Sequence, residues 1–249
     1  MAQIELTGLT KRYRKVTAVD GLTVTVAPGR VTGFVGANGA GKTTTMRMIV
    51  GLSRPTSGTA TLNGRAYRDL ADPLRTVGAM LDPNCFHPNR SGRDSLRVIA
   101  RSVGIADVRV DEVISQVDLT EHATRRTRGY STGMRQRLAL AAALLGDPDT
   151  LILDEPANGL DPQGIRWLRT LIRHLASQGR TVLVSSHQLA ELSQTVDDVI
   201  IIDQGRLVTH QPMPQLLAQA STTSLEDVYL ALVEQSDRNQ SPRPTRSTR

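Results

Sequence analysis

The stretch Gly36–Thr43 reads GANGAGKT, and its pattern G-x-x-x-x-G-K-[ST] guides the interpretation of the whole sequence. Glycines let the backbone of such a loop curl, so that successive N–H groups point at phosphate oxygens. Lys42 brings a positive charge to the outer phosphates, and Thr43 offers a hydroxyl ligand for Mg²⁺. Residues 31–35 predict a strand before the loop, and residues 44–50 predict a helix whose positive dipole end faces the same anion. The stretch therefore predicts a binding site for a nucleoside triphosphate.

The whole loop and the residue after it are expected to contact the triphosphate. These residues are Gly36, Ala37, Asn38, Gly39, Ala40, Gly41, Lys42, Thr43 and Thr44. A plain glycine turn without a ligand is the alternative interpretation. The complete motif between a predicted strand and a predicted helix favours the binding site.

Composition limits the classes of protein to which the chain can belong. Its 249 residues suffice for one large domain, or for a core with a subdomain. The single cysteine excludes an internal disulfide and is consistent with a reducing cytoplasm. No apolar run approaches the roughly 18 residues that span a bilayer. Only 3% of the residues are aromatic, so base-stacking platforms are scarce and no nucleic-acid partner is expected.

Half of the net charge of +6 lies at the end of the sequence. Residues 236–249 hold four arginines against one aspartate and contain no large apolar side chain. Such a composition cannot bury enough apolar surface to fold, so a disordered basic tail is predicted here. A solvated tail is favoured over one that contacts anionic lipid or nucleic acid. The folded domain is therefore expected over residues 1–235.

Strand patterns that alternate with helical patterns predict an α/β fold with a largely parallel sheet. From Cys85 to Leu145 helical patterns dominate, for example a face with an apolar residue at Val110, Val113, Ile114 and Val117. Ser224 has the position of an N-cap before a closing helix. The predicted parts of the domain are core segments 1–84 and 146–215, a helical insertion over about 85–145, and a closing helix over about 224–233.

Two carboxylates and a histidine directly follow apolar runs that predict strands. They are Asp154, Glu155 and His187. Ligands of parallel sheets bind at the carboxyl ends of strands, so these side chains are expected near the phosphates. Asp154 is predicted to hold Mg²⁺ opposite Thr43, Glu155 to polarise the water that attacks the γ-phosphate, and His187 to orient that water or to bond the phosphate. The alternatives are an acidic pair that caps a helix and a strand-end histidine without function.

Two further features each allow two interpretations from the residues alone. Tyr13 lies among basic residues, so its ring can stack on a nucleotide base or belong to a partly exposed loop. The turn Ser131–Gly133 precedes a long apolar helix, and it suits either an anion site or an ordinary N-cap. Physical reasoning alone favours the cap.

In combination and in this order, the motifs resemble those of the ATP-binding subunits of ABC transporters, over about residues 2–233. The matches are Gly36–Thr43 to the Walker A loop, Leu151–Glu155 to Walker B, Ser131–Gly133 to the signature motif, Gly159–Asp161 to the D-loop, His187 to the switch histidine and Tyr13 to the adenine-stacking aromatic. The signature motif is the specific part, because other Walker-motif ATPases lack it.

The resemblance implies an α/β fold: a P-loop NTPase core with a mainly parallel sheet, an N-terminal antiparallel β subdomain and a helical insertion. It implies ATP and Mg²⁺ as ligands. The roles that it implies are catalytic for Lys42, Glu155 and His187, ATP-binding for Tyr13, Ser131 and Gly133 besides the loop, and metal-facing for Thr43, Asp154 and Asp82.

The resemblance also implies partners. A head-to-tail dimer, formed by two copies or with a second ATP-binding subunit, would hold two ATP molecules in its interface. Ser131 and Gly133 of one subunit would then contact the γ-phosphate held by the other. The helical insertion would dock onto a separately encoded integral membrane permease, so the chain is expected in the cytoplasm, peripheral on the inner face of the cell membrane. Met134–Gln136 and the closing helix resemble bacterial drug and antibiotic exporters, which implies that the chain powers export of an unknown substrate.

Two departures from the family pattern affect the expected geometry. Asp82 stands where the family usually has glutamine, and an aspartate can face Mg²⁺ only with a shorter reach. The signature reads STG, with Thr132 in place of a glycine and Tyr130 in place of a usual leucine. Since Thr132 is still small and polar, the contact is expected to survive with changed geometry. ATP hydrolysis is expected to persist.

Two other functions compete with transport. A soluble ATPase that acts on ribosomes or DNA would usually carry two nucleotide-binding units or a long coiled-coil or zinc-hook insertion, and this sequence has one unit and a short insertion. A non-hydrolysing ATP switch or drug-sequestering module is disfavoured by the intact set Asp154, Glu155 and His187.

Overall fold

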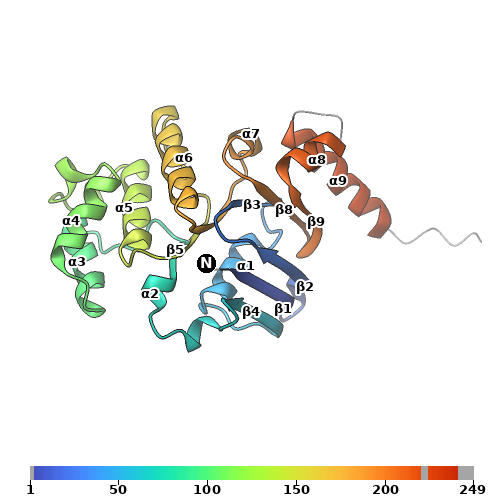
Figure 1. Cartoon of the computed structure of the whole chain (residues 1–249), viewed down its shortest axis with the longest axis horizontal. Coiled ribbons are helices and arrows are strands. Elements are labelled where there is room, and N and C mark those ends of the chain that lie inside the picture. Colours follow the sequence, from blue (N-terminus) through green and yellow to red (C-terminus); the bar gives the residue numbers. More distant parts are fainter. Residues whose placement is uncertain (1–2, 220–223, 241–249) are drawn as a thin grey trace, which may run out of the picture.

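The computed structural model describes residues 3–219 and 224–240, and these residues form two sheets (Figure 1). The strands of the larger sheet are, in spatial order, β5 (Val77–Met80), β6 (Thr150–Leu153), β7 (Thr181–Ser185), β3 (Val31–Val35), β8 (Asp198–Asp203) and β9 (Arg206–Pro212). The first five pair in parallel, and β9 is antiparallel to β8. The predicted α/β fold with a mainly parallel sheet is confirmed.

The smaller sheet comes from the N-terminal part of the chain and is antiparallel. Its spatial order is β2 (Val16–Val26), β1 (Ile4–Tyr13) and β4 (Ser57–Leu62). On β2, the side chains of Leu22 and Val24 are buried and that of Thr23 between them is exposed, as expected for a strand with one covered face. The predicted N-terminal antiparallel subdomain is confirmed.

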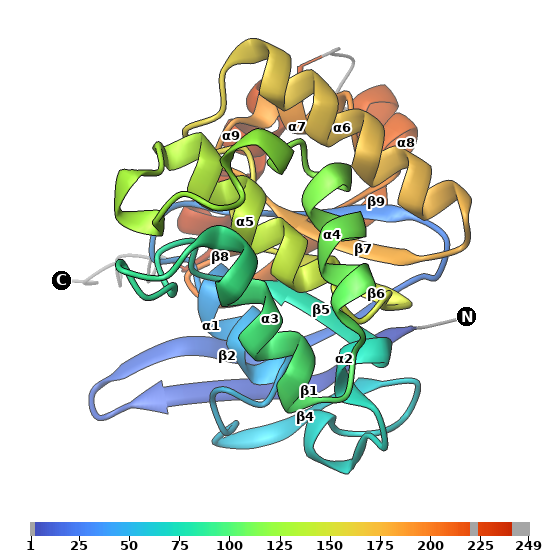
Figure 2. The same ribbon diagram turned by 90° about the vertical axis from the view of Figure 1, so that its left-hand side faces the viewer.

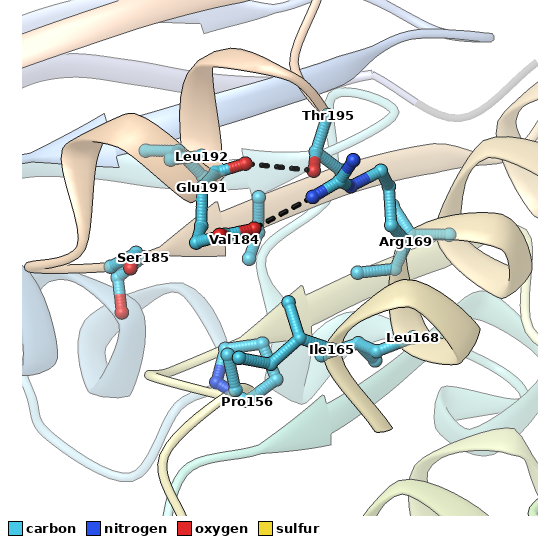
Figure 3. A pocket seen from close by; sticks show the side chains of 12 residues that line it. Pro156, Ile165, Leu168, Arg169, Val184, Ser185, Glu191, Leu192 and Thr195 are labelled. Atoms are coloured by element: carbon cyan, nitrogen blue, oxygen red, sulfur yellow. Dashed lines mark hydrogen bonds and ion pairs between the residues drawn. The ribbon is translucent and has the colours of Figure 1, made fainter. Parts of the chain in front are cut away.

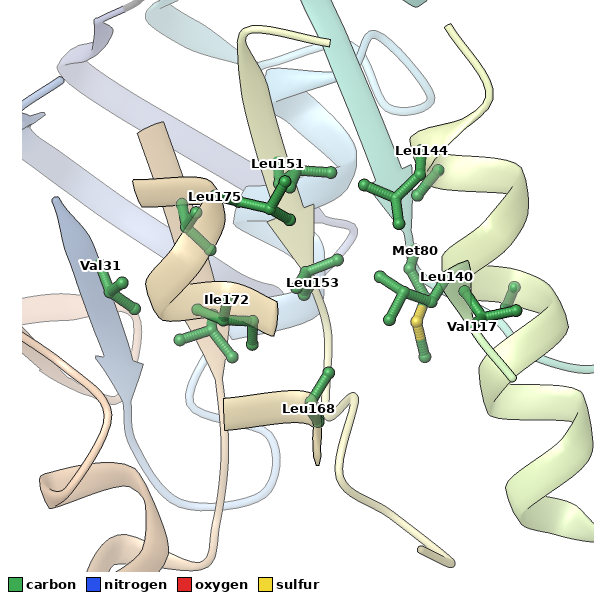
Figure 4. Packing of buried hydrophobic residues seen from close by; sticks show 14 of the residues in the cluster. Val31, Met80, Val117, Leu140, Leu144, Leu151, Leu153, Leu168, Ile172 and Leu175 are labelled. Carbon is green, nitrogen blue, oxygen red and sulfur yellow. The ribbon is translucent and has the colours of Figure 1, made fainter. Parts of the chain in front are cut away.

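Helices and the smaller sheet cover both faces of the central strands of the larger sheet. Successive side chains on a strand point to opposite sides, so each of these strands contributes to two cores. The covering helices are α5 (Thr132–Leu144) and α6 (Pro162–Ser177) on one face and α1 (Lys42–Ile49) on the other. On β6, Leu151 and Leu153 belong to the cluster of α5 and α6, which Figure 4 shows, while Ile152 belongs to the cluster of α1 and the smaller sheet. The continuous apolar runs in the sequence correspond to strands covered on both sides.

The chain between β5 and β6 forms a group of helices that covers one side of the molecule (Figure 2). These helices are α3 (Gly92–Ser102), α4 (Asp107–Gln116) and α5. The apolar face that the sequence predicts for α4 and the residue after it is buried, and its members Val110, Val113, Ile114 and Val117 are at most 1% exposed. Arg137 of α5 lies over the ring of Trp167 of α6, 4.2 Å from its centroid, and so joins this group to the core. The predicted helical insertion is confirmed.

The end of the described chain differs from the prediction. The helix α9 (Leu225–Gln240) follows Ser224, whose Oγ accepts a hydrogen bond from the N–H of Asp227 at 3.3 Å, as predicted for an N-cap. The helix continues beyond the predicted end near residue 233, so residues 236–240 are helical rather than part of a disordered tail. The sequence has no proline between Leu225 and Pro242 that would stop the helix earlier. Residues 241–249 of the predicted tail lie outside the described residues.

The sequence did not predict several smaller elements. They are β9 and the helices α2 (Pro73–Thr76), α7 (Leu189–Ser193) and α8 (Met213–Gln219). Among all helices in the described part of the chain, none has the length and apolar character needed to cross a membrane.

Candidate active site

Three neighbouring strands of the larger sheet bring the predicted motifs together. The strand β3 lies beside β7, and β7 lies beside β6, so their carboxyl ends meet at one edge of the sheet. A cleft of about 180 Å³ opens there. Its lining residues are Asn38, Gly39, Gly41, Lys42, Thr43, Thr44, Asp154 and Glu155. The predicted phosphate loop and the predicted acidic pair thus line one cleft.

The curled shape of the loop depends on glycine at two points. At Gly41, where φ is 106°, a Cβ atom would collide with the carbonyl oxygen of Ala18. At Gly36, a Cβ atom would lie 2.5 Å from the carbonyl oxygen of Ile202. The loop is therefore pressed against β2 and β8. The helix α1 begins at Lys42, within the loop, and the first N–H groups of a helix have no partner inside it. This cradle fits a phosphate group.

Lys42 supplies the positive charge of the cleft. Its side chain is 7% exposed, and its Nζ donates hydrogen bonds to the carbonyl oxygens of Gly36 at 2.6 Å and Ala37 at 3.2 Å. Burial lowers the pKa of Lys42, and the nearby charges of Glu155 and Asp154 oppose that shift. A buried cation held by neutral carbonyl groups suits an anionic ligand.

The oxygen atoms opposite Lys42 fit a magnesium ion. The Thr43 hydroxyl donates to Oδ2 of Asp154 at 2.5 Å, which places a hydroxyl and a carboxylate side by side, the ligand types that Mg²⁺ uses together with phosphate oxygens. The described residues contain no group of three or more His, Cys, Asp or Glu side chains that could hold a metal ion. A metal here would therefore depend on Thr43, Asp154 and oxygen atoms of the triphosphate.

Glu155 and His187 form a pair at the mouth of the cleft. Nδ1 of His187 lies 2.8 Å from Oε2 of Glu155, and the His187 backbone N–H donates to the same oxygen at 3.3 Å. Since an ionised carboxylate only accepts hydrogen bonds, a bond to ionised Glu155 requires a proton on Nδ1 of His187. The imidazole is half exposed. The arrangement suits a general base with an orienting partner.

Two groups that contact the acidic pair were not predicted from the sequence. The hydroxyl of Ser185, the last residue of β7, donates to Oδ1 of Asp154 at 2.5 Å and accepts from the N–H of Glu155 at 2.9 Å. Nε2 of Gln136, on α5, donates to the carbonyl oxygen of Glu155 at 3.4 Å. A polar residue in a buried strand, two positions before a candidate catalytic histidine, is a signal that could have found Ser185.

Eight predicted site residues are not among the residues that line this cleft. Gly36, Ala37 and Ala40 belong to the loop itself, and His187 contacts Glu155. The other four are Tyr13, Asp82, Ser131 and Gly133. Tyr13 is 49% exposed at the end of β1, and Nζ of Lys11 lies 4.9 Å from the centroid of its ring. The carboxylate of Asp82 is exposed and accepts a hydrogen bond from the N–H of Asn84 at 2.8 Å.

The signature turn is exposed at the start of α5. Oγ of Ser131 accepts from the N–H of Met134 at 3.2 Å, which is the N-cap interpretation. A Cβ atom on Gly133 would lie 3.1 Å from the carbonyl oxygen of Gly159, so this turn packs against the predicted D-loop. Tyr130 is buried and donates to the carbonyl oxygen of His122 at 2.8 Å, and burial raises the pKa of its phenol. The tyrosine that replaces a usual leucine therefore anchors the turn to the helical insertion.

This fold and this cleft define a P-loop protein that binds a nucleoside triphosphate. Within that class, the chain belongs to the ABC transporter family, because the family model described as ABC transporter matches residues 19–158. It is an ATP-binding subunit of that family and an ATPase.

Curated relatives give the same family. The chain is 43% identical over 217 residues to the bacitracin transport ATP-binding protein BcrA of Bacillus licheniformis, a match that covers 86% of this chain and 71% of the relative. It is 34% identical over 207 residues to the lantibiotic transport ATP-binding protein SrtF of Streptococcus pyogenes, which covers 82% of this chain and 89% of the relative.

Solved structures share the fold. A structure described as the ATP binding subunit of an ABC transporter matches with a TM-score of 0.83 and 25% identity, over 92% of this chain and 99% of that one. A dimeric bacterial ABC transporter cassette matches with a TM-score of 0.77 and 20% identity, over 84% of this chain and 98% of that one.

Proposed function

We propose that ATP hydrolysis by this chain, at the residues named above, powers an export pump and that the chain works with a separately encoded membrane permease. The observation that carries hydrolysis is the Glu155–His187 pair, which lies beside the paired oxygens of Thr43 and Asp154. The names of two relatives, which specify bacitracin and lantibiotic transport, support export of a compound of this kind.

The residues of the cleft divide the chemistry among them. Lys42 and the loop N–H groups bind the phosphates, and Thr43 and Asp154 hold Mg²⁺. The ion, when bound, neutralises negative charge on the phosphate oxygens. Glu155 accepts a proton from the attacking water, and His187 keeps the Glu155 carboxylate directed at that water. Tyr13 stacks on the adenine through the ring face that Lys11 does not cover.

The exposed signature turn supports a two-subunit site. Ser131 and Gly133 lie outside the cleft of their own chain and present a hydroxyl and a helix N-terminus to the surroundings. In a head-to-tail dimer they contact the γ-phosphate bound by the other subunit. Asp82 is exposed two residues after β5, and in that closed arrangement it would face the Mg²⁺ ion.

The helical insertion α3–α5 supplies the docking surface for the permease, which holds the chain at the inner face of the cell membrane. The exposed apolar side chains on and next to α3 and α4 support this: Val98, Val103 and Val108 are each at least 50% exposed.

Phosphate release from ATP by the full chain tests hydrolysis, and pull-down from detergent-solubilised membranes tests the partner. We expect Mg²⁺-dependent release and capture of a hydrophobic permease. A chain that binds ATP and never releases phosphate, alone or with the captured partner, contradicts the motor function. Capture of ribosomes or DNA in place of a permease contradicts the transport function.

A further inference from the structure

Ser185 contacts both Asp154 and Glu155, although no motif includes it. It ends β7, and its side chain is completely buried. Its hydroxyl donates to Oδ1 of Asp154 and accepts from the backbone N–H of Glu155. A hydroxyl has one proton to donate, so these two contacts together fix its orientation. Ser185 therefore connects Asp154, which bonds Thr43, with Glu155, the next residue in the chain.

The backbone at Glu155 requires such support. Its φ angle is 51°, in the left-handed region that non-glycine residues rarely occupy, and such a conformation persists only where the surroundings hold it. The groups that hold it are Ser185 at its N–H, Gln136 and the N–H of Asn158 at its carbonyl oxygen, and His187 at its carboxylate. The Ser185 bond, at 2.9 Å, is the shortest of these contacts to the Glu155 backbone.

The contacts of the two Asp154 carboxylate oxygens show why the orientation of this carboxylate depends on Ser185. Oδ1 accepts from Ser185 and Oδ2 accepts from Thr43, so the carboxylate plane is fixed from both sides. Without the serine hydroxyl, the buried Oδ1 would lose this donor, and the carboxylate could rotate away from Thr43. The Thr43 hydroxyl oxygen and Oδ2 of Asp154, which are expected to face the metal, would then no longer be aligned.

We propose that Ser185 is a positioning residue for ATP hydrolysis: its hydroxyl directs the Asp154 carboxylate toward Thr43 and holds Glu155 in its left-handed conformation. This inference rests on the proposed hydrolysis by Glu155. Ser185 acts through these two residues and touches no phosphate itself.

Two substitutions at Ser185 form a matched test. A cavity of about 40 Å³ lies between α6, α7 and the end of β7, with apolar walls that include Ile165 and Leu192 (Figure 3). The Ser185 hydroxyl points instead to Asp154. Ser185→Thr keeps the hydroxyl, and Ser185→Val has nearly the same shape without it. A comparison of these two variants therefore separates the effect of the lost hydrogen bonds from the effect of a changed side-chain shape.

Steady-state hydrolysis by the full-length variants gives the first readout. We expect Ser185→Thr to keep kcat near that of the unaltered chain, and Ser185→Val to lose about 10²-fold in kcat with little change in KM for ATP, since misplaced catalytic groups cost rate rather than binding. Ser185→Ala, which adds no volume, is expected to behave like Ser185→Val. Equal kcat values for the Thr and Val variants would overturn the proposal.

Mg²⁺ titration of a fluorescent ATP analogue gives a second readout that needs no hydrolysis. Ser185→Val is expected to need about tenfold more Mg²⁺ for half-maximal binding than Ser185→Thr, as for the loss of a residue that orients a metal ligand. Identical titrations with identical melting temperatures would overturn the proposal. Absence of hydrolysis by the unaltered chain would instead contradict the proposed function, and this titration would still decide the role of Ser185.

Discussion

The two regions expected to touch one triphosphate, the phosphate cleft and the signature turn, are constructed in opposite ways. In the cleft, Lys42 and Asp154 are buried and bonded to groups of the same chain. The signature turn is exposed, and the hydroxyl of Ser131 is bonded within its own helix. One chain alone can therefore form the cleft in its working geometry, whereas the turn offers a surface that gains its role from a second chain.

The largest effect is expected from Glu155→Gln, which removes the general base from the cleft and leaves the signature turn unaltered. Hydrolysis should fall by about 10²–10⁴-fold, the range that general-base catalysis contributes, while ATP binding persists. Phosphate release and equilibrium ATP binding measure the two quantities, and ATP should now hold the dimer closed in size-exclusion chromatography. Glu121→Gln, at an exposed carboxylate, is the control. Full hydrolytic activity of Glu155→Gln would contradict the role of Glu155 as the general base, and so the proposal that the cleft carries the catalytic groups.

Ser131→Ala tests the other side of the comparison. ATP binding by a single chain should be unchanged, because Ser131 does not line the cleft. ATP-driven dimer formation and hydrolysis should both fall, by roughly tenfold, if one charge-assisted hydrogen bond of about 1.5 kcal/mol is lost. Analytical ultracentrifugation with ATP measures the dimer. The lost N-cap also costs about 1 kcal/mol of stability, so Ser91→Ala, which removes the N-cap of α3, serves as the control. A weakened monomer–ATP complex would contradict the prediction.

A smaller effect is expected from Gly92→Ala, which disturbs the support of the signature turn. A Cβ atom at residue 92 would collide with the hydroxyl of Tyr130. The buried ring would shift from its bond to His122, at a cost of about 1–3 kcal/mol, as for other overpacked sites. Thermal unfolding measures this loss. Gly104→Ala, where added atoms meet open space but φ is 74°, gives the cost of backbone strain alone. Equal melting temperatures for the Gly92 variant and the unaltered chain would show that Tyr130 is not a tight anchor.

The smallest effect is expected from Thr132→Gly, which restores the usual glycine of the signature motif. Glycine in the first turn of α5 should cost up to about 1 kcal/mol of stability. Hydrolysis should change by less than about threefold, which corresponds to 0.65 kcal/mol, because Ser131 and Gly133 remain. A large gain in kcat would mean that the threonine restrains the turn.

The sequence predicted most of the cleft because the cleft follows from local order: an apolar strand, then a polar group at its carboxyl end. Asp154, Glu155 and His187 each follow that rule. Local order could not predict that Ser185 bonds Asp154, because 31 residues separate the two and only the pairing of β6 with β7 brings them together. The strand β9 was missed because it is an edge strand with mixed exposure and ends in Pro212, so it lacks a clean alternation.

The long helix α5 has a consequence for communication between subunits. It begins at the signature turn, and Gln136, little more than one turn further along, donates to the backbone of Glu155. In the proposed dimer, one rigid element would thus touch the partner's nucleotide at its tip and its own catalytic base along its side. Binding of ATP at one nucleotide site would then change the rate of hydrolysis at the other. We expect sigmoidal dependence of hydrolysis on ATP concentration, with a Hill coefficient above one and no greater than about two, the number of sites.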